Sequence, residues 1–393
     1  MTGRTDRSEH SGLPLEGVRV IEFSHMVMGP TCGMILADLG AEVIKIEPPG
    51  GDKTRVLQGA GTGFYRTFNR NKKSVVLDLH APAGRAAARE LIGQCDVLLQ
   101  NFRPGLMAQM GLAYADLEKG HPRLIYVSHT GFLPGPYENR LALDEVVQNM
   151  AGLTYMTGPP GRPLRAGSSV NDIMGGMFGA VGVLAALRER DRTGRGQEIE
   201  SALFENCCFL SAQHMQQFLM TGEEPVPFPS KASPWAVYDT FEVADGDQLF
   251  VGAVSDKQFL ALCELLGRSD LANDPALATN GDRVKARPTL LPRLAESLRT
   301  QEIDSLCQRL EAAGCPYARV VRPDQLLHDE HLLASGGLVP MDTPEGPTQA
   351  VLLPLSMGGR RLGVRRPLPS AGQDNDEILG ALKSAAATYG RTA

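Results

Sequence analysis

The chain has 393 residues, of which 42% are hydrophobic and 21% are charged, a composition typical of a globular protein large enough for two domains. Its formal net charge of -6 disfavours nucleic acid and anionic membranes as principal partners, because both are bound by basic surfaces. Its seven cysteines form no CxxC pair and no cluster with histidine at zinc spacing, so we expect free thiols, no metal site and a cytoplasmic location.

The first half of the chain alternates between strand-like and helix-like segments. Residues 1–12 come first; they are polar and charged, lack the apolar core of a signal peptide, and are expected to be disordered. The turn over 24–30 lacks the GxGxxG spacing of a dinucleotide site, which disfavours NAD and FAD. The alternation predicts a doubly wound α/β sheet. Its predicted strands are 18–23, 42–47, 74–79, 96–101 and 124–129, and its predicted helices are 31–39 and 84–92.

Two short segments beside predicted strands contain basic residues. Asn69 to Lys73 precedes a strand and Asn101 to Gly105 follows one. Ligands of open α/β sheets bind beyond the carboxyl ends of strands, so the second segment is well placed for a phosphorylated ligand. The alternative for Lys72, Lys73 and Arg103 is an ordinary solvated surface.

Residues 168–182 hold a lone carboxylate, Asp172, at the start of a predicted helix that contains several glycines. Glycine is unfavourable in a helix interior, so its repetition predicts close approach of another segment or a ligand to the backbone. Asp172 is interpreted either as a helix cap or as a nucleophilic acid. Both roles fit an ionised carboxylate near a helix N-terminus.

The second half of the chain contains the sharpest change in composition. Residues 188–197 are polar and rich in glycine, which predicts an exposed connection before a strand over 198–203. Four prolines within 225–234 predict a domain boundary. A smaller α+β segment follows, and a last helix is predicted from about Asp376.

Together these segments resemble the class III CoA-transferases, the CaiB/BaiF family, which includes formyl-CoA:oxalate transferase and α-methylacyl-CoA racemase. The resemblance covers nearly the whole chain. It implies a large CoA-binding Rossmann-like domain built from residues 13–224 and 335–393, a small α+β domain over 225–334, and two ring-shaped subunits interlocked as a homodimer. The motifs that carry the resemblance are Leu15 to Phe23, Ala37 to Asp52, Asn69 to Leu79, Asn101 to Gly105 and Thr193 to Gln197.

The resemblance also implies the site residues. The family's nucleophilic aspartate falls on Asp172. His80 and Gln109 stand where relatives often carry Lys and Arg near the CoA phosphates, and Leu141 stands where formyl-CoA transferase has a lysine. Leu143 replaces the histidine of the racemase branch, and leucine cannot carry a proton. The implied CoA contacts are His25, Met26, Val27, Met28, Leu77, His80, Asn101, Phe102 and Arg103.

The expected activity is transfer of CoA from an acyl-CoA donor to a carboxylic acid, through aspartyl anhydride and aspartyl-CoA thioester intermediates on Asp172. CoA and acyl-CoA are substrates, no tightly bound cofactor is expected, and succinyl-CoA is the expected donor. Gly175 and Gly176 are candidates for oxyanion N–H donors. Arg165 or Lys231 is expected to pair with the distal carboxylate of a dicarboxylic acid.

Three alternatives remain open from the sequence. Gln148 either orients a substrate carboxylate or is a satisfied polar residue on a helix. The enzyme is either a transferase or an acyl-CoA racemase or isomerase that uses Asp144 or Glu145 as proton carrier. A protein that binds CoA as a scaffold, without turnover, is the alternative to both of these enzyme activities. Formate and oxalate are disfavoured as acids, because residues 228–234 replace the glycine-rich lid of formyl-CoA transferase.

Overall fold

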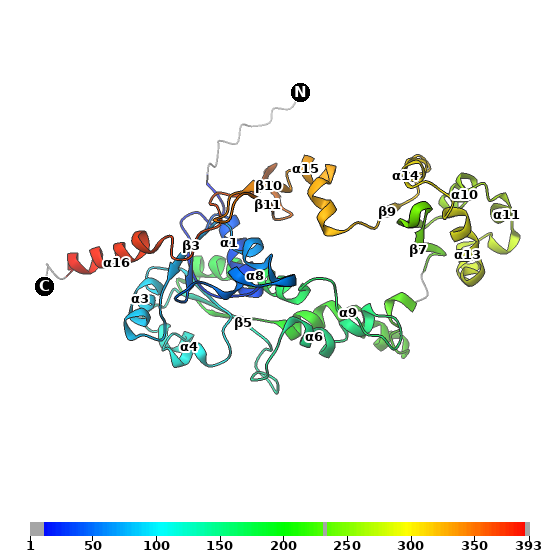
Figure 1. The fold of residues 1–393 in the computed structure, drawn as a ribbon. Helices are drawn as coiled ribbons and strands as arrows, with labels where there is room; N and C mark the ends of the chain where they lie inside the picture. The colour runs from blue at the N-terminus through cyan, green and yellow to red at the C-terminus, as the bar shows by residue number, and fades with distance from the viewer. Residues whose placement is uncertain (1–11, 231–233, 390–393) are drawn as a thin grey trace, which may run out of the picture. The chain divides into compact units, whose positions relative to one another are not determined.

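The computed structural model describes residues 12–230 and 234–389, and this part of the chain folds as two compact units. The first comprises the chain up to Pro229 together with the chain from Glu330, and the second comprises Ser230–Asp329. The first unit contains the blue-to-green and the orange-to-red segments of the ribbon (Figure 1). The boundaries predicted from the sequence lie a few residues away, at 225 and 334.

A parallel sheet forms the centre of the first unit. Within the described residues it has six strands in the order β3-β2-β1-β4-β5-β6, and every pairing is parallel. The order reverses beside β1, so the carboxyl ends of β1 and β4 flank a topological switch point, where ligands of such sheets bind. The predicted parallel α/β sheet is confirmed. The strands are β1 (Arg19–Phe23), β2 (Glu42–Glu47), β3 (Lys72–Val76), β4 (Val97–Gln100), β5 (Ile125–Thr130) and β6 (Glu198–Ala202).

Helices pack on both faces of this sheet, because alternate side chains of its buried strands point to opposite faces. Val20, Val97 and Val127 form a core with α1 and α8 on one face. Ile21 and Leu98 form a core with α3 and α16 on the other, and α16, which is remote in sequence, therefore lies near α3 and β3 (Figure 1). These helices are α1 (Met28–Asp38), α3 (Pro82–Ile92), α4 (Leu106–Gln109), α5 (Tyr114–Leu117), α8 (Val170–Thr193) and α16 (Asn375–Tyr389).

The segment before α16 covers the edge strand β3. The backbone N–H of Ser74 donates to Asp374 Oδ2 at 2.8 Å, and that of Val76 donates to Asn375 Oδ1 at 2.8 Å. Side chains thus satisfy edge groups that would otherwise be open to pairing with another chain.

α8 is the longest helix of the described chain and is apolar. By length and composition alone it is the one described helix that could cross a membrane. Core helices of globular proteins pass the same test, and one face of α8 packs against α1 in the core of this unit. Its composition is therefore weak evidence for a membrane span.

The sequence analysis missed or shortened several helices. It gave no bounds to a helix within residues 144–157 and placed none over residues 203–221, and it interpreted residues 188–197 as an exposed connection. Most of these residues are exposed, as predicted, but α8 continues to Thr193, and Arg190 is 7% exposed and pairs with Asp96 at 3.0 Å. The prediction of a connection is therefore wrong for residues 188–193. The missed helices are α6 (Asp144–Met150), α7 (Leu153–Thr157) and α9 (Leu203–Thr221).

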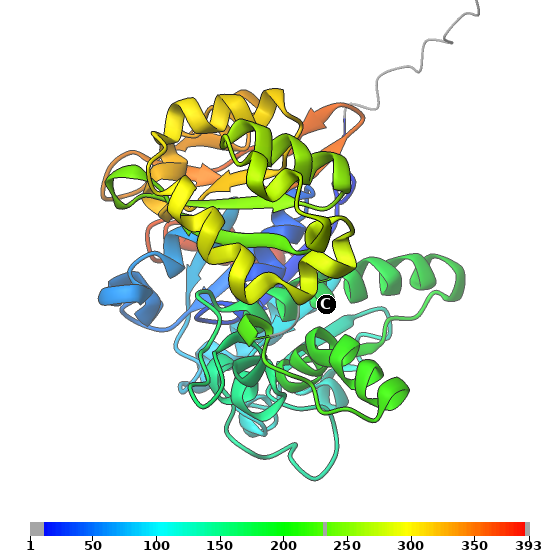
Figure 2. The ribbon, with the colours of Figure 1, turned by 90° about the vertical axis from the view of Figure 1, so that its right-hand side faces the viewer.

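The second unit has an antiparallel sheet with helices around one core, which agrees with the predicted α+β segment. Phe259, Leu294 and Leu310 are fully buried in that core, and Figure 2 shows the sheet and its helices from the front. Its main elements are β7 (Val237–Glu242), β8 (Gln248–Ala253), β9 (Tyr317–Arg319), α10 (Asp256–Leu265), α13 (Arg287–Leu298) and α14 (Ile303–Ala312). Smaller elements of the chain are α2 (Phe64–Phe68), α11 (Ser269–Ala272), α12 (Asn280–Lys285), α15 (Glu330–Ala334), β10 (Leu338–Met341), β11 (Thr348–Val351), β12 (Ser356–Met357) and β13 (Arg360–Arg361).

Candidate active site

The first turn of α8 and the turn between β1 and α1 lie side by side. A Cβ added at Gly176 would lie 2.6 Å from the carbonyl oxygen of Met28 and 2.6 Å from Thr31 Cβ. Ile173 packs in the same small apolar cluster as Val27. Asp172 is therefore held close to the loop that follows β1, at the switch point of the sheet.

Asp172 lies in the first turn of α8 but does not cap the helix. Ser169 precedes the helix and makes no side-chain cap hydrogen bond. The cap comes from α6, where Asp144 Oδ1 accepts from the backbone N–H of Asn171 at 2.8 Å and from that of Asp172 at 3.2 Å. The capping interpretation of Asp172 thus passes to Asp144, and the Asp172 carboxyl is left available for chemistry.

The surroundings of Asp172 favour its protonated form. Burial, and after it the negative charge of Asp144, raise the pKa of Asp172 to about 7, while Arg165 opposes this change. A carboxyl with such a pKa is divided between its two forms near neutral pH, and its anion is more basic than an ordinary aspartate. Nucleophilic catalysis by a carboxyl needs that anion.

Arg165 lies at the rim of this site. It pairs with Glu145, its Nη2 lies 4.0 Å from Asp144 Oδ2, and its side chain is 43% exposed. A guanidinium in this position is accessible to a carboxylate from solution. The other predicted cation, Lys231, lies outside the described residues.

Gln148 is fully buried and both ends of its amide are used within the protein. Its Nε2 donates to Asp144 Oδ2, and its Oε1 accepts from the backbone N–H of Ala166 at 2.8 Å. Direct contact with a substrate is excluded by this burial. Of the two interpretations of Gln148, the structure supports the satisfied polar residue.

Gly175 and Gly176 serve helix packing. A Cβ at Gly175 would lie 2.2 Å from Met28 Cε, and Gly176 is equally crowded by α1. Both residues lie inside α8, where each N–H bonds a carbonyl of the preceding turn. The predicted oxyanion role therefore does not fit this structure, since these N–H groups are already used.

A pocket of about 430 Å³ opens beyond the carboxyl ends of four strands. Its walls are mostly apolar, with His25, Lys53 and His80 as basic residues around them. An apolar pocket with basic side chains suits a nucleotide, whose base is flat and whose phosphates are anionic. His25, Leu77, His80 and Phe102 were predicted from the sequence, whereas Lys53, Leu106 and Met110 were missed because none of them belongs to a motif. Lys53 begins a 3-10 turn, Leu106 begins α4 and Met110 follows it. The lining residues are Ser24, His25, Ile46, Glu47, Pro48, Pro49, Asp52, Lys53, Leu77, Asp78, Leu79, His80, Phe102, Leu106 and Met110.

Asn101 fixes the loop that follows β1. Its Oδ1 accepts from the backbone N–H of His25 at 3.0 Å, and its Nδ2 donates to the backbone carbonyl of His25 at 2.7 Å. The next residue, Met26, has φ of 63°, a conformation that is unfavourable for a side chain of this kind and is often found at functional sites. Asn101 thus shapes the pocket through His25.

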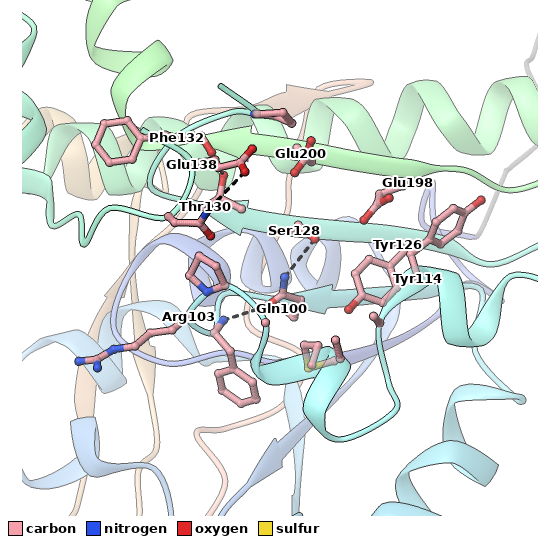
Figure 3. A pocket seen from close by; sticks show the side chains of 18 residues that line it. Gln100, Arg103, Tyr114, Tyr126, Ser128, Thr130, Phe132, Glu138, Glu198 and Glu200 are labelled. Atoms are coloured by element: carbon pink, nitrogen blue, oxygen red, sulfur yellow. Dashed lines mark hydrogen bonds between the residues drawn. The ribbon is translucent and has the colours of Figure 1, made fainter. Parts of the chain in front are cut away.

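Three other predicted CoA residues lie elsewhere. The side chains of Val27 and Met28 are buried, at 1% and 4% exposure, so they support α1 instead of lining the pocket. Arg103 lines a second pocket of about 250 Å³, where Figure 3 shows its guanidinium pointing away from Glu198 and Glu200. Carboxylates line both pockets, but in the larger one Glu47 pairs with Arg55 and Asp52 pairs with Lys45. Their negative charge is therefore compensated, which makes the larger pocket the better candidate for the phosphates of CoA.

The basic segment before β3 has a structural role. Arg70 and Lys72 are 2% and 0% exposed and pair with Asp38 at 2.6 Å and Glu22 at 2.8 Å. Phosphate binding is therefore wrong for both residues, and the alternative of a solvated surface is wrong for Lys72. Their carboxylate partners lie far away in sequence, which is why no local pattern revealed the pairing. Lys73 pairs with Glu42 and Glu377 at 2.5 Å each.

The fold and the site together define an α/β protein with a nucleotide-sized pocket at the switch point of a parallel sheet. The helix that carries Asp172 packs against the segment that follows β1. A sequence model of CoA-transferase family III matches residues 15–375. The chain belongs to this family and is a class III CoA-transferase.

Similar proteins support this assignment along the whole chain. A succinyl-CoA–D-citramalate CoA-transferase of Chloroflexus aurantiacus is 32% identical, covering 95% of this chain and 94% of that protein. A succinate–glutarate CoA-transferase of Agrobacterium fabrum is 33% identical, covering 94% and 96%. A crystal structure of a CaiB/BaiF family protein from Brucella suis superposes with a TM-score of 0.87 at 32% identity, covering 94% of this chain and all of that one.

Proposed function

We propose that this enzyme transfers CoA from succinyl-CoA to a carboxylic acid, with Asp172 as the nucleophile. The proposal rests on the position of the Asp172 carboxyl. Asp144 caps the first turn of α8, so the carboxyl of Asp172 is not needed as a cap, and it lies beside the loop that shapes the large pocket. Relatives named for succinyl-CoA and for succinate support the donor.

The reaction conserves the thioester bond and needs no external energy source. Asp172 attacks the thioester carbonyl carbon, the CoA thiolate leaves, and an aspartyl-succinyl anhydride forms. The thiolate attacks the aspartyl carbonyl, which breaks the anhydride and releases succinate. The acceptor carboxylate then attacks the aspartyl-CoA thioester, and the released thiolate attacks the acceptor acyl carbon to regenerate the Asp172 carboxylate.

The large pocket is the proposed CoA site. Leu77, Leu106 and Met110 would contact the adenine, and His25, Lys53 and His80 would meet the phosphates. All of these residues follow the carboxyl ends of strands, where open α/β sheets bind ligands.

Arg165 is the proposed partner for the distal carboxylate of a dicarboxylic acid. It is partly exposed and lies close enough to Asp172 to influence its pKa. Relatives named for glutarate and for D-citramalate agree with a dicarboxylic acceptor. Racemisation is less well supported, because Asp144 is 7% exposed and occupied by the start of α8, which leaves it no access to a substrate α-carbon.

The proposed assembly is the interlocked homodimer, in the cytoplasm. α8 and α9 expose an apolar surface in which Phe178 and Phe209 contact edge to face, with ring centroids 5.8 Å apart. Large exposed apolar side chains gathered on neighbouring helices are typical of an interface. We call it the α8/α9 apolar surface; it consists of Met177, Phe178, Val181, Leu184, Phe209, Leu210, Met215, Phe218, Leu219 and Met220.

Trapping of the covalent intermediate tests the activity. The enzyme is incubated with succinyl-CoA, quenched with hydroxylamine and examined by peptide mass spectrometry, beside D172N and a matched E145Q control. A hydroxamate on Asp172 in wild type and E145Q, absent in D172N, supports the proposal. Glutarate, D-citramalate and oxalate are then compared as acceptors, with R165A expected to raise KM for the first two. Absence of any adduct would refute the mechanism.

A further inference from the structure

Asp144 approaches Asp172 from a different helix and accepts two hydrogen bonds from the backbone that carries Asp172. We propose that Asp144 is a positioning residue for the transfer reaction: it holds the first turn of α8 in place and puts a fixed negative charge beside the nucleophile. This inference rests on the proposed function of Asp172.

The contacts of Asp144 fix its side chain from two sides. Its Oδ1 accepts from the N–H groups of Asn171 and Asp172, at 2.8 and 3.2 Å. Its Oδ2 accepts from Gln148, which is itself anchored to the backbone of Ala166. Gln148 and Asn171 are fully buried, so the carboxylate has little freedom to turn away from α8.

The charge of Asp144 has only a distant counterion. Arg165 Nη2 lies 4.0 Å from Asp144 Oδ2, and Arg165 is paired more closely with Glu145 on the solvent side. In the second turn of α8, α1 presents Met28 and α9 presents Asn206 to Gly175, and both side chains are uncharged. Burial is the largest cause of the raised pKa of Asp172; of the charged groups, Asp144 raises this pKa and Arg165 lowers it.

This arrangement favours the covalent intermediates. Two neighbouring carboxylates repel each other in the free enzyme. When Asp172 becomes an anhydride or a thioester it loses its charge, and the repulsion ends. Asp144 therefore raises the free energy of the resting carboxylate relative to the acyl-enzyme, and it makes that carboxylate a stronger base and nucleophile.

The test separates the charge of Asp144 from its role as a cap. D144N keeps an oxygen for the two N–H groups and removes the charge. We expect the acidic limb of the kcat/KM profile to move to lower pH by on the order of one pH unit, with a lower rate on the plateau. D144A also loses the acceptor oxygen and is expected to melt at lower temperature. E138Q, which removes an exposed charge from the loop after β5 and leaves the Arg165 pair intact, should leave the limb in place.

A second measurement does not depend on turnover. The carboxyl carbon of Asp172, labelled with carbon-13 and assigned by comparison with D172N, is titrated by NMR in substrate-free wild type and D144N. A lower pKa of Asp172 in D144N supports the inference even if no acyl adduct forms. Failure of the proposed function can therefore be distinguished from failure of the inference about Asp144. An unchanged pKa in folded D144N overturns it. If D144N does not fold, D144S, a smaller uncharged acceptor, takes its place and is judged by the same criterion.

Discussion

Ionised Asp172 is expected to lower the free energy of unfolding at neutral and alkaline pH. Its pKa is raised to about 7, so the folded state binds this proton more tightly than the unfolded chain does. The associated stability is fully present below the unfolded pKa near 4 and is lost as pH rises to about 7. D172N, which cannot ionise, should therefore exceed wild type in unfolding free energy at pH 8 by about 4 kcal/mol, while losing transferase activity.

Urea unfolding of the two proteins at pH 4 and pH 8 checks this prediction. The difference between them should be small at pH 4 and favour D172N at pH 8. If the difference in unfolding free energy is the same at both pH values, ionisation of Asp172 does not destabilise the folded protein, and the prediction is wrong.

Asn101 is expected to control CoA affinity without touching CoA. Replacement by leucine removes both hydrogen bonds to the backbone of His25. Each such bond contributes about 1 kcal/mol, so N101L should weaken CoA binding about tenfold or more. Calorimetric titration with CoA measures this effect. Q109A is the control. Gln109 is exposed and lies outside the lining of the large pocket, so the Kd of Q109A for CoA should match that of wild type.

At the scale of elements, the α1–α8 contact depends on glycine. Alanine normally stabilises a helix by about 1 kcal/mol relative to glycine, but at Gly176 the added Cβ would meet backbone and Thr31 at 2.6 Å. G176A should therefore destabilise the protein by about 2 kcal/mol. G380A in α16, where an added Cβ meets nothing within 4 Å, should be neutral or stabilising. Equal effects of the two substitutions in urea unfolding would contradict this account.

The strands β1, β2 and β3 are joined by a buried charge cluster. Glu22 pairs with Lys72 at 2.8 Å and with Lys45 at 3.4 Å, and all three side chains are at most 1% exposed. E22Q leaves two buried ammonium groups without this carboxylate and should cost about 3–5 kcal/mol of unfolding free energy. E345Q breaks an exposed pair with Arg66 and should change it by less than about 1 kcal/mol. Chemical denaturation that finds the two equivalent would refute the role of burial.

At the scale of the whole molecule, the α8/α9 apolar surface is expected to be covered by a second copy. Phe209 is 68% exposed and Leu219 is 72% exposed. A carboxylate placed at either position would be desolvated in an interface, so F209D and L219D should shift sedimenting species toward the monomer. V351D, at a similarly exposed position on β11 away from this surface, is the control. A wild type that sediments as a monomer would rule out the proposed dimer.

The fold was predictable from the sequence wherever local periodicity coincides with tertiary burial. The strand over 42–47 was predicted with its observed bounds, and the other predicted strands of the large sheet lie within a few residues of those observed. Helices α6 and α9 were missed, because neighbouring segments and not a simple apolar stripe decide which of their residues are buried. Arg70 and Lys72 were misinterpreted for the same reason, since their partners are remote in sequence.

The sequence by itself determined the parallel α/β architecture, the family and the residue proposed as nucleophile, because these follow from periodicity and from motifs with fixed order and spacing. Only the tertiary structure decided what surrounds Asp172. In the structure Asp144 caps α8, and Gln148 is buried. Gly175 and Gly176 pack against α1, and residues that follow four different strands line one pocket. These assignments depend on contacts between segments far apart in the chain, and no local pattern contains them.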